Sequence, residues 1–143
     1  PSNIMGALAC AQLDRIDELL KIKSFIRDTY LKLISREIID MSIISDTSSN
    51  KNGCWATTIV IHNENFDKNL LIKYFESQLI PLRPFFYCLT DMPAYQSYRI
   101  KNFNNNNAIY LSSRGITLPS HYKITYEQIS FISNTLNKYM QTI

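Results

Sequence analysis

Residues 4–34 read IMGALACAQLDRIDELLKIKSFIRDTYLKLI, and apolar residues recur through them at steps of three to five. That spacing is close to the period of about 3.6 residues in an α-helix, and no proline interrupts the segment. We therefore predict one helix, whose start Ser2 or Asn3 can cap by accepting a backbone N–H. At about 1.5 Å per residue, this helix spans on the order of 45 Å. A domain of this size cannot cover both ends of such a rod, so we expect the helix to bridge to another domain or to a partner subunit.

The rest of the chain predicts short strands and helices around a small sheet. Together with the first helix, this pattern predicts an α+β fold, with a bridging helix over residues 1–36 and a small domain over residues 37–143. Most predicted elements have a boundary signal, which is a polar loop, a proline, a glycine or a capping residue. The elements are a β-prone run at 38–44, a strand at 54–61, a helix at 67–79 capped by Asp67, an aromatic loop at 82–95, a helix at 108–114 closed by Gly115 as its C′ residue, a strand at 116–118, and a last helix opened by a Thr125–Gln128 capping box.

The composition argues against several classes of protein. With 45% hydrophobic and 19% charged residues, the chain has enough apolar surface for a core, and wholesale disorder is not expected. No apolar run approaches the roughly 18 residues that a membrane span needs. The net charge of +3 is dispersed along the chain, which disfavours a nucleic-acid-binding surface. The first residues, Pro1-Ser2-Asn3, show no secretory signal and no initiator Met, which fits a chain cut from something longer.

Cysteines and histidines give no chemical motif. Cys10, Cys54 and Cys88 are widely spaced among apolar neighbours. Their odd number indicates buried thiols in a reducing compartment, so we expect a cytoplasmic protein without a disulfide framework. His62 and His121 have no cysteine or carboxylate partner at metal-ligand spacing, and no metal site is expected. A thiol–imidazole pair is conceivable, but core cysteines and unrelated histidines are the favoured interpretation.

Two positions are candidates for binding an anion. Arg83 is flanked by proline and aromatic residues, and its planar guanidinium suits a carboxylate or a phosphate. Phe85, Phe86 and Tyr87 follow it and can stack on a ring. A packed loop with Arg83 in a structural ion pair is an equally supported interpretation. Asn3 stands at a predicted helix N-terminus, where free N–H groups attract anions, although a plain N-cap asparagine is the simpler interpretation.

Several blocks stand in order along the chain: SNIMGALACAQLDRIDE at 2–18, RPFFY at 83–87, MPAY at 92–95, RGITLPS at 114–120 and TYEQI at 125–129. In order and spacing this set resembles the DegT/StrS-type sugar aminotransferases, which are pyridoxal-phosphate (PLP) enzymes of fold type I. The Arg-Pro-Phe-Phe form is most similar to the perosamine-synthase-like members. Those enzymes install a 4-amino group on a nucleotide-linked 4-keto-6-deoxy sugar. The resemblance covers nearly the whole chain.

The resemblance implies that the chain is the C-terminal portion of such an enzyme, the small domain of PLP fold type I. In the family, a large N-terminal domain carries the PLP pocket and the Schiff-base lysine. That domain is absent from this chain, so no catalytic residue is assigned here. By the same resemblance, Asn3 reaches across the interface of a homodimer to the PLP phosphate of the neighbouring subunit. Arg83 is assigned to a phosphate or carboxylate of the substrate, and Phe86, Tyr87 and Tyr95 to the sugar-nucleotide cleft.

The leading hypothesis is therefore a domain of a PLP-dependent aminotransferase for polysaccharide biosynthesis. The whole enzyme moves an amino group from glutamate to a 4-keto-6-deoxy sugar nucleotide. This segment completes the dimer and the substrate cleft and is not active alone. The alternative is a free-standing, non-enzymatic α+β module that dimerises through its long helix. Neither hypothesis expects a nucleic-acid or membrane partner.

Overall fold

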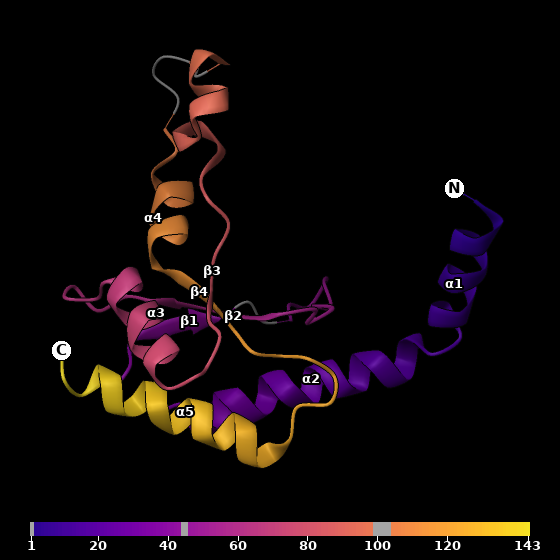
Figure 1. Ribbon diagram of the computed structural model, residues 1–143, viewed down its shortest axis with the longest axis horizontal. Coiled ribbons are helices and arrows are strands. Elements are labelled where there is room, and N and C mark those ends of the chain that lie inside the picture. The colour runs from indigo at the N-terminus through magenta and orange to yellow at the C-terminus, as the bar shows by residue number, and fades with distance from the viewer. Residues whose placement is uncertain (1, 44–45, 99–103) are drawn as a thin grey trace.

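The computed structural model describes residues 2–43, 46–98 and 104–143 (Figure 1). In chain order its elements are α1 (Asn3–Leu13), α2 (Ile16–Leu33), β1 (Met41–Ile43), β2 (Thr57–Ile61), α3 (Lys68–Ser77), β3 (Arg83–Pro84), the 3₁₀ helices η1 (Leu89–Asp91) and η2 (Pro93–Tyr98), α4 (Asn106–Arg114), β4 (Gly115–Leu118) and α5 (Tyr126–Met140). The strands form one antiparallel sheet in the order β1-β2-β4-β3. Helices pack against this small sheet, so the predicted α+β fold is confirmed.

The single helix predicted over residues 4–34 is wrong, because the chain turns between α1 and α2. The N–H of Arg15 bonds to the carbonyl of Gln12, three residues back, which is the tighter pattern of a 3₁₀ turn, and α1 ends at Leu13. Arg15 leaves the helical conformation at φ −109° and ψ 7°, and its side chain pairs with Glu18 in the first turn of α2. None of residues 3–13 is buried, so no packing holds α1 in line with α2. Cys10 is consequently exposed, against the expectation of a buried thiol.

The core lies between one face of the sheet and the helices α2 and α5, which run side by side beneath it in Figure 1. Successive side chains of a strand point to opposite faces, so alternate residues of β2 and β4 face these helices. Ile59 lies opposite Ile116 in the register, and both are fully buried. The core also holds, from the two strands and the two helices, Ile61, Leu118, Ile26, Tyr30, Ile129, Ile132, Leu136 and Met140.

The helix starts predicted from capping residues are confirmed. The Asp67 side chain accepts from the N–H groups of Asn69 and Leu70, and α3 begins at the next residue after the cap. Thr125 and Gln128 form the predicted capping box at the start of α5. The end of the 67–79 helix is two residues earlier than predicted, because the chain leaves the helix at Gln78 and Leu79 has a positive φ of 58°.

Two of the predicted strands are found in shorter form, and the 116–118 strand is found one residue longer, as β4. Of the β-prone run 38–44, residues 41–43 form β1, and residue 44 lies outside the described residues. The 54–61 strand starts only at Thr57, because Cys54 takes a φ of 49° that no strand accommodates. β3 is an additional, two-residue strand at the sheet edge, where the missing N–H of Pro84 is tolerated.

Gly115 ends α4 as predicted, but it is not a left-handed C′ residue. Its φ is −82° and its ψ 135°, which is extended backbone. A Cβ built at this position lies 2.7 Å from the carbonyl oxygen of Leu111 and 2.7 Å from the Cβ of Phe85. Glycine is therefore required by close approach of two chain segments, and not by backbone conformation.

Tyr30 gives the fold a measurable dependence on alkaline pH. Its ring is fully buried, its hydroxyl donates to the carbonyl oxygen of Pro119 at 2.7 Å, and burial raises the pKa of the phenol well above its ordinary value. The folded state therefore holds the proton more tightly, so stability is fully present below the unfolded pKa and lost above it. We expect the free energy of unfolding to fall by about 1.4 kcal/mol between pH 8 and pH 11 on this account. Urea unfolding of Tyr30→Phe should lack this part of the loss, and equal losses in both proteins would contradict the assignment.

Candidate functional site

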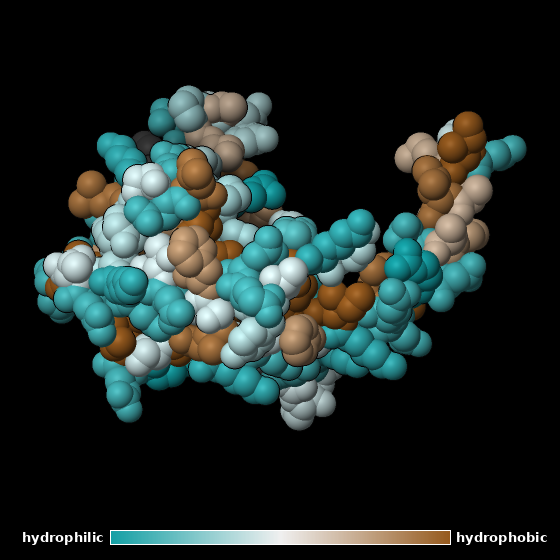
Figure 2. Space-filling model, turned by 60° about the horizontal axis from the view of Figure 1, so that its bottom comes forward, coloured by the Kyte–Doolittle hydropathy of each residue, from teal (hydrophilic) through white to brown (hydrophobic). Residues whose placement is uncertain are grey.

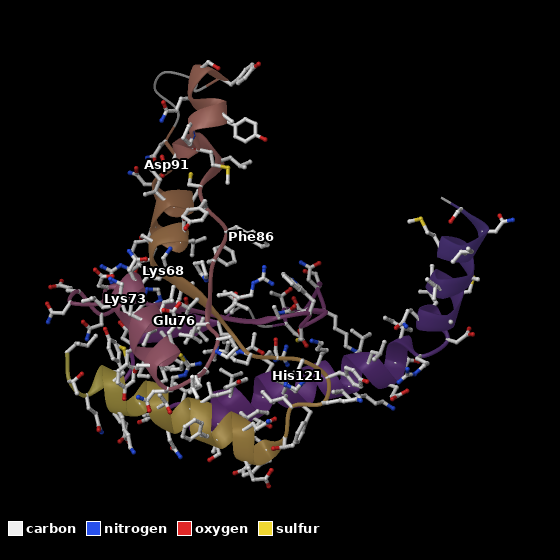
Figure 3. The ribbon with its side chains drawn as sticks, viewed as in Figure 1. Lys68, Lys73, Glu76, Phe86, Asp91 and His121 are labelled. Carbon is white, nitrogen blue, oxygen red and sulfur yellow. The ribbon has the colours of Figure 1, made fainter. Side chains whose placement is uncertain are left out.

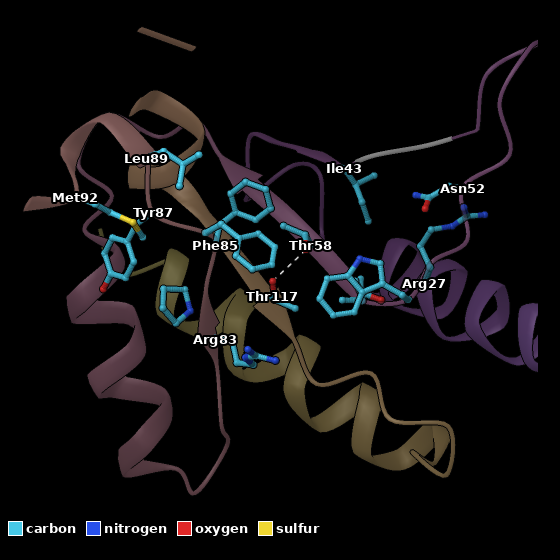
Figure 4. A pocket seen from close by; sticks show the side chains of 15 residues that line it. Arg27, Ile43, Asn52, Thr58, Arg83, Phe85, Tyr87, Leu89, Met92 and Thr117 are labelled. Carbon is cyan, nitrogen blue, oxygen red and sulfur yellow. Dashed lines mark hydrogen bonds between the residues drawn. The ribbon is translucent and has the colours of Figure 1, made fainter. Parts of the chain in front are cut away.

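A cavity of about 770 Å³ lies on the open face of the sheet (Figure 4). Its floor holds Thr58 and Thr117, which are cross-strand partners with their hydroxyl oxygens 3.0 Å apart. By strand alternation these side chains point away from the core residues Ile59 and Ile116. The other lining residues are Arg27, Ile43, Asn52, Trp55, Ala56, Thr57, Arg83, Pro84, Phe85, Phe86, Tyr87, Leu89 and Met92.

One wall of the cavity is the segment from β3 to η1. Pairing of β3 with β4 places Arg83 opposite Thr117, and the N–H of Phe85 donates to the carbonyl of Gly115 at 3.0 Å. These bonds fix the backbone that carries Arg83 at the edge of the floor. The Arg83 side chain is exposed, and no acidic residue in the described part of the chain forms an ion pair with it. Its guanidinium is therefore open to an anionic ligand.

The opposite wall joins α2 to the loop before β2. Arg27 pairs with Asp28 at 2.9 Å and with Asp46 at 3.4 Å, and it donates to the Sγ of Cys54 at 3.0 Å. The backbone N–H of Asn52 donates to the Asp46 carboxylate at 2.7 Å; that bond, assisted by Arg27, lowers the pKa of the Asp46 carboxyl. Arg27 thus anchors the loop, and most of its charge is balanced locally.

Tyr87 is held in place from behind the cavity. Lys68, the first residue of α3, is at the end of that helix nearest α4 in Figure 3, and it donates to the carbonyl of Ser112 at 2.6 Å. The same ammonium lies 5.7 Å from the centre of the Tyr87 ring, a cation–π distance. The N–H of Cys88 donates to the Ser112 hydroxyl at 3.3 Å. Partial burial lowers the pKa of Lys68, as expected for an amine that is removed from water by these contacts.

The structure brings some of the predicted site residues together and leaves others apart. Arg83, Phe86 and Tyr87 line the cavity. Tyr95 is on η2 and about half exposed, and it does not line the cavity. Asn3 is the first residue of α1, whose free end projects far from the sheet in Figure 1. Within this chain the cavity and Asn3 are therefore separate places.

Sequence reasoning missed Arg27 and Trp55 as lining residues. Arg27 has the spacing of an ordinary helix-surface cation, and only the fold brings its helix beside the loop at 46–55. Trp55 belongs to the strand that the sequence predicts at 54–61, where a large aromatic residue is expected on a packed face. One signal was available, since Trp55 is the only tryptophan of the chain and follows a polar, glycine-terminated loop.

The structure does not assemble a thiol–imidazole pair from His62. Its Nδ1 lies 2.6 Å from the hydroxyl of Tyr110 and its Nε2 lies 3.0 Å from the hydroxyl of Ser42, so both nitrogens have partners. Cys54 and Cys88 are buried, as predicted. Among the residues that the structure describes, no three His, Cys, Asp or Glu side chains form a group that could hold a metal ion. None of the described helices is long and apolar enough to cross a membrane.

Comparison with known proteins decides the family. Residues 2–137 match the DegT/DnrJ/EryC1/StrS aminotransferase family. The chain belongs to this family. The resemblance inferred from the sequence blocks is confirmed, and the match includes α1 and most of α5.

Relatives of this family member include two curated enzymes. It is 28% identical over 144 residues to GDP-perosamine synthase of Vibrio cholerae, which covers 99% of this chain and 38% of that enzyme. It is also 28% identical over 138 residues to GDP-perosamine synthase of Escherichia coli O157:H7, covering 96% and 36% respectively. The chain thus spans a little over a third of the length of the curated relatives that it matches.

Solved structures of aminotransferases share the fold. A Streptococcus pneumoniae protein described as a sugar aminotransferase, in its PMP form, superposes with a TM-score of 0.83 at 23% identity and covers 99% of this chain and 35% of its own. The Helicobacter pylori aminotransferase PseC superposes with a TM-score of 0.82 at 17% identity, covering 96% and 37% respectively. The architecture of the small sheet and its helices is therefore that of sugar aminotransferases.

Proposed function

We propose that this chain contributes the C-terminal domain of a PLP-dependent nucleotide-sugar aminotransferase. The whole enzyme acts in the cytoplasm and transfers an amino group from glutamate to a 4-keto-6-deoxy sugar nucleotide. Family membership supports amino transfer, and the two perosamine synthases support the class of sugar. The observation that carries the proposal is Arg83, whose guanidinium has no acidic partner among the described residues and lies in a cavity with aromatic walls. An arginine fork beside apolar surface suits a ligand with an anionic part and a ring.

The cofactor-binding contribution of this chain is proposed at the start of α1. PLP, when bound, supplies the electron sink that amino transfer needs. The Ser2 side chain accepts the N–H of Met5, whereas the N–H groups of Asn3 and Ile4 have no acceptor in the described part of the chain. These N–H groups, with the Asn3 amide, fit a phosphate. Because α1 projects away from the cavity, Asn3 serves the phosphate of a cofactor held by a second subunit.

The state of α1 supports a homodimer and a missing large domain. Its apolar side chains are exposed, among them Ile4 at 75% and Leu8 at 62%, and Figure 2 shows hydrophobic surface over much of this helix. A helix that is apolar on most sides is stable in water only when another domain or subunit covers its apolar side chains. Residues 1–36 therefore act as the interdomain and dimer element, and residues 37–143 as the small domain. The Schiff-base lysine belongs to the large N-terminal domain, so this segment alone is inactive.

In the proposed cleft, the cavity residues bind and orient the substrate. Arg83 holds a phosphate or carboxylate, and the exposed rings of Phe86 and Tyr87 pack against the sugar or the base. Tyr95 is assigned to the substrate from outside the lining, and its N–H donates to the carbonyl of the lining residue Met92 at 3.0 Å. The apolar walls exclude water from the bound substrate.

The test is a chimera in which residues 2–143 replace the matching segment of the Vibrio cholerae enzyme. We expect a PLP-loaded dimer that transfers the amino group of glutamate to a GDP-linked 4-keto-6-deoxy sugar. PLP loading is read from absorbance, assembly from native mass, and turnover from glutamate-dependent product formation. A folded, PLP-loaded dimer without turnover would overturn the proposal. A stable dimer of the chain itself that is indifferent to PLP would support the alternative, a non-enzymatic module that dimerises through α1.

A further inference from the structure

The charge around the cavity is one-sided. Arg27 and Arg83 line it, and no Asp or Glu is among the lining residues that the structure describes. Arg27 is already paired with Asp28 and Asp46, so Arg83 is the lining cation that an incoming anion can use. A site of this kind favours a ligand that carries an anionic group. Its volume of about 770 Å³ is within the range of small-molecule sites.

Trp55 is exposed to the cavity on a backbone that is held firmly. Its side chain is 66% exposed, although it is the largest apolar residue type. Its carbonyl accepts a hydrogen bond from Lys23 at 3.0 Å, and the same ammonium donates to the carbonyl of Ser120. On the preceding side, Cys54 is fixed by the N–H bond to the Asn52 side chain at 2.9 Å. These three bonds hold the backbone around Trp55, and the exposed indole can serve as a stacking platform.

We infer that the nucleotide half of the substrate binds in this cavity, with its base stacked on Trp55 and its diphosphate held by Arg83. The inference rests on the proposed function for the identity of the ligand, and it deepens that function by assigning Trp55. The Arg83 guanidinium matches phosphate oxygens in a bidentate manner. The indole offers a π-face that is tolerant of the base, so Trp55 supplies affinity and the polar groups of the cavity supply orientation.

Trp55 is the only tryptophan of the chain, so intrinsic tryptophan fluorescence measures binding at this residue alone. Titrating the 143-residue chain with GDP should quench the tryptophan fluorescence in a saturable manner. Guanosine should also quench, but with an affinity about tenfold weaker, since hydrogen bonds to charged groups are lost. Pyrophosphate should not quench, and it should displace GDP. Absence of quenching by millimolar GDP in chain that circular dichroism shows to be folded would overturn the inference.

Variants separate the two contacts. Arg83→Gln should abolish the advantage of GDP over guanosine while quenching by guanosine persists. For Trp55→Leu, equilibrium dialysis should show GDP binding weakened at least about fivefold. Phe131→Leu is the matched control, since Phe131 is 55% exposed on α5 and does not line the cavity. Equal GDP binding in Trp55→Leu and Phe131→Leu would overturn the assignment.

The failures of the two proposals are distinguishable. If the chain binds GDP through Trp55 and the PLP-loaded chimera is inactive, the nucleotide site stands and the aminotransferase function fails. If the chimera is active and Trp55→Leu leaves its KM for the nucleotide sugar unchanged, the function stands and the Trp55 site fails.

Discussion

Gly115→Ala is expected to destabilise the domain by about 3 kcal/mol, the upper part of the usual range for overpacking. The added methyl group meets the carbonyl oxygen of Leu111 at 2.7 Å. This oxygen belongs to the backbone of α4, and moving it breaks helical hydrogen bonds. On the other side it meets the Cβ of Phe85 at 2.7 Å and the Cγ at 3.0 Å. The chain must therefore either open the end of α4 or push Phe85 away from the sheet.

The matched control is Gly53→Ala, because no atom lies within 4 Å of a Cβ at Gly53 and its φ is not positive. Urea unfolding should show a large drop in midpoint for Gly115→Ala and almost none for Gly53→Ala. Since Phe85 lines the cavity and its N–H bonds to the carbonyl of Gly115, the same substitution should weaken nucleotide binding. Equal stabilities of the two variants would show that the close approach at Gly115 is wrong.

Local signals in the sequence predicted those parts of the fold that local chemistry determines. Asp67 and Thr125 cap their helices because side-chain oxygens satisfy free N–H groups within three residues. The α5 core face follows from a spacing that any amphipathic helix shows. Contacts between distant segments were not available in the same way. Part of the need for glycine at position 115 comes from Phe85, thirty residues earlier in the chain, and so the sequence suggested a left-handed cap instead.

The break between α1 and α2 shows a second limit. The apolar residues keep a helical spacing on both sides of Asp14 and Arg15, so the sequence predicts one helix. The pattern shows which positions are apolar, but it does not show whether other residues pack against them. With no buried residue in α1, the local bonds of Asp14 and Arg15 decide the direction of the chain.

Only one wall of the cavity, the one formed by the contiguous segment 83–87, could be predicted from the sequence. Arg83, Phe86 and Tyr87 stand close together in sequence, so a proline-bordered aromatic run was a sufficient signal. Arg27 and Trp55 line the cavity from α2 and from the loop before β2, two segments that only the tertiary fold brings together. The spacing of residues in the sequence does not predict that these two segments line the same cavity.

Arg83→Gln is expected to lower kcat/KM of the chimeric enzyme for the nucleotide sugar by about tenfold, because hydrogen bonds to a charged group contribute about 1.5 kcal/mol or more. The glutamine keeps part of the side-chain volume and a donor, but it removes the charge and the bidentate fork. If Arg83 holds the diphosphate, which does not react, the loss appears as a raised KM with nearly unchanged kcat. Arg83→Lys should recover part of the affinity, because it restores the charge without the fork.

The control for charge loss is Lys73→Gln on α3, an exposed lysine outside the cavity that Figure 3 shows near the outer side of that helix. Both glutamine variants lower the net charge by one, so a general electrostatic effect on a polyanionic substrate would appear in both. We expect the Lys73 variant to keep the parent kinetics. If instead KM for glutamate rises in Arg83→Gln while KM for the nucleotide sugar does not, Arg83 binds the carboxylate of the amino donor. That outcome would remove the diphosphate from the cavity, since Arg83 is the one lining cation among the described residues that carboxylates do not already balance.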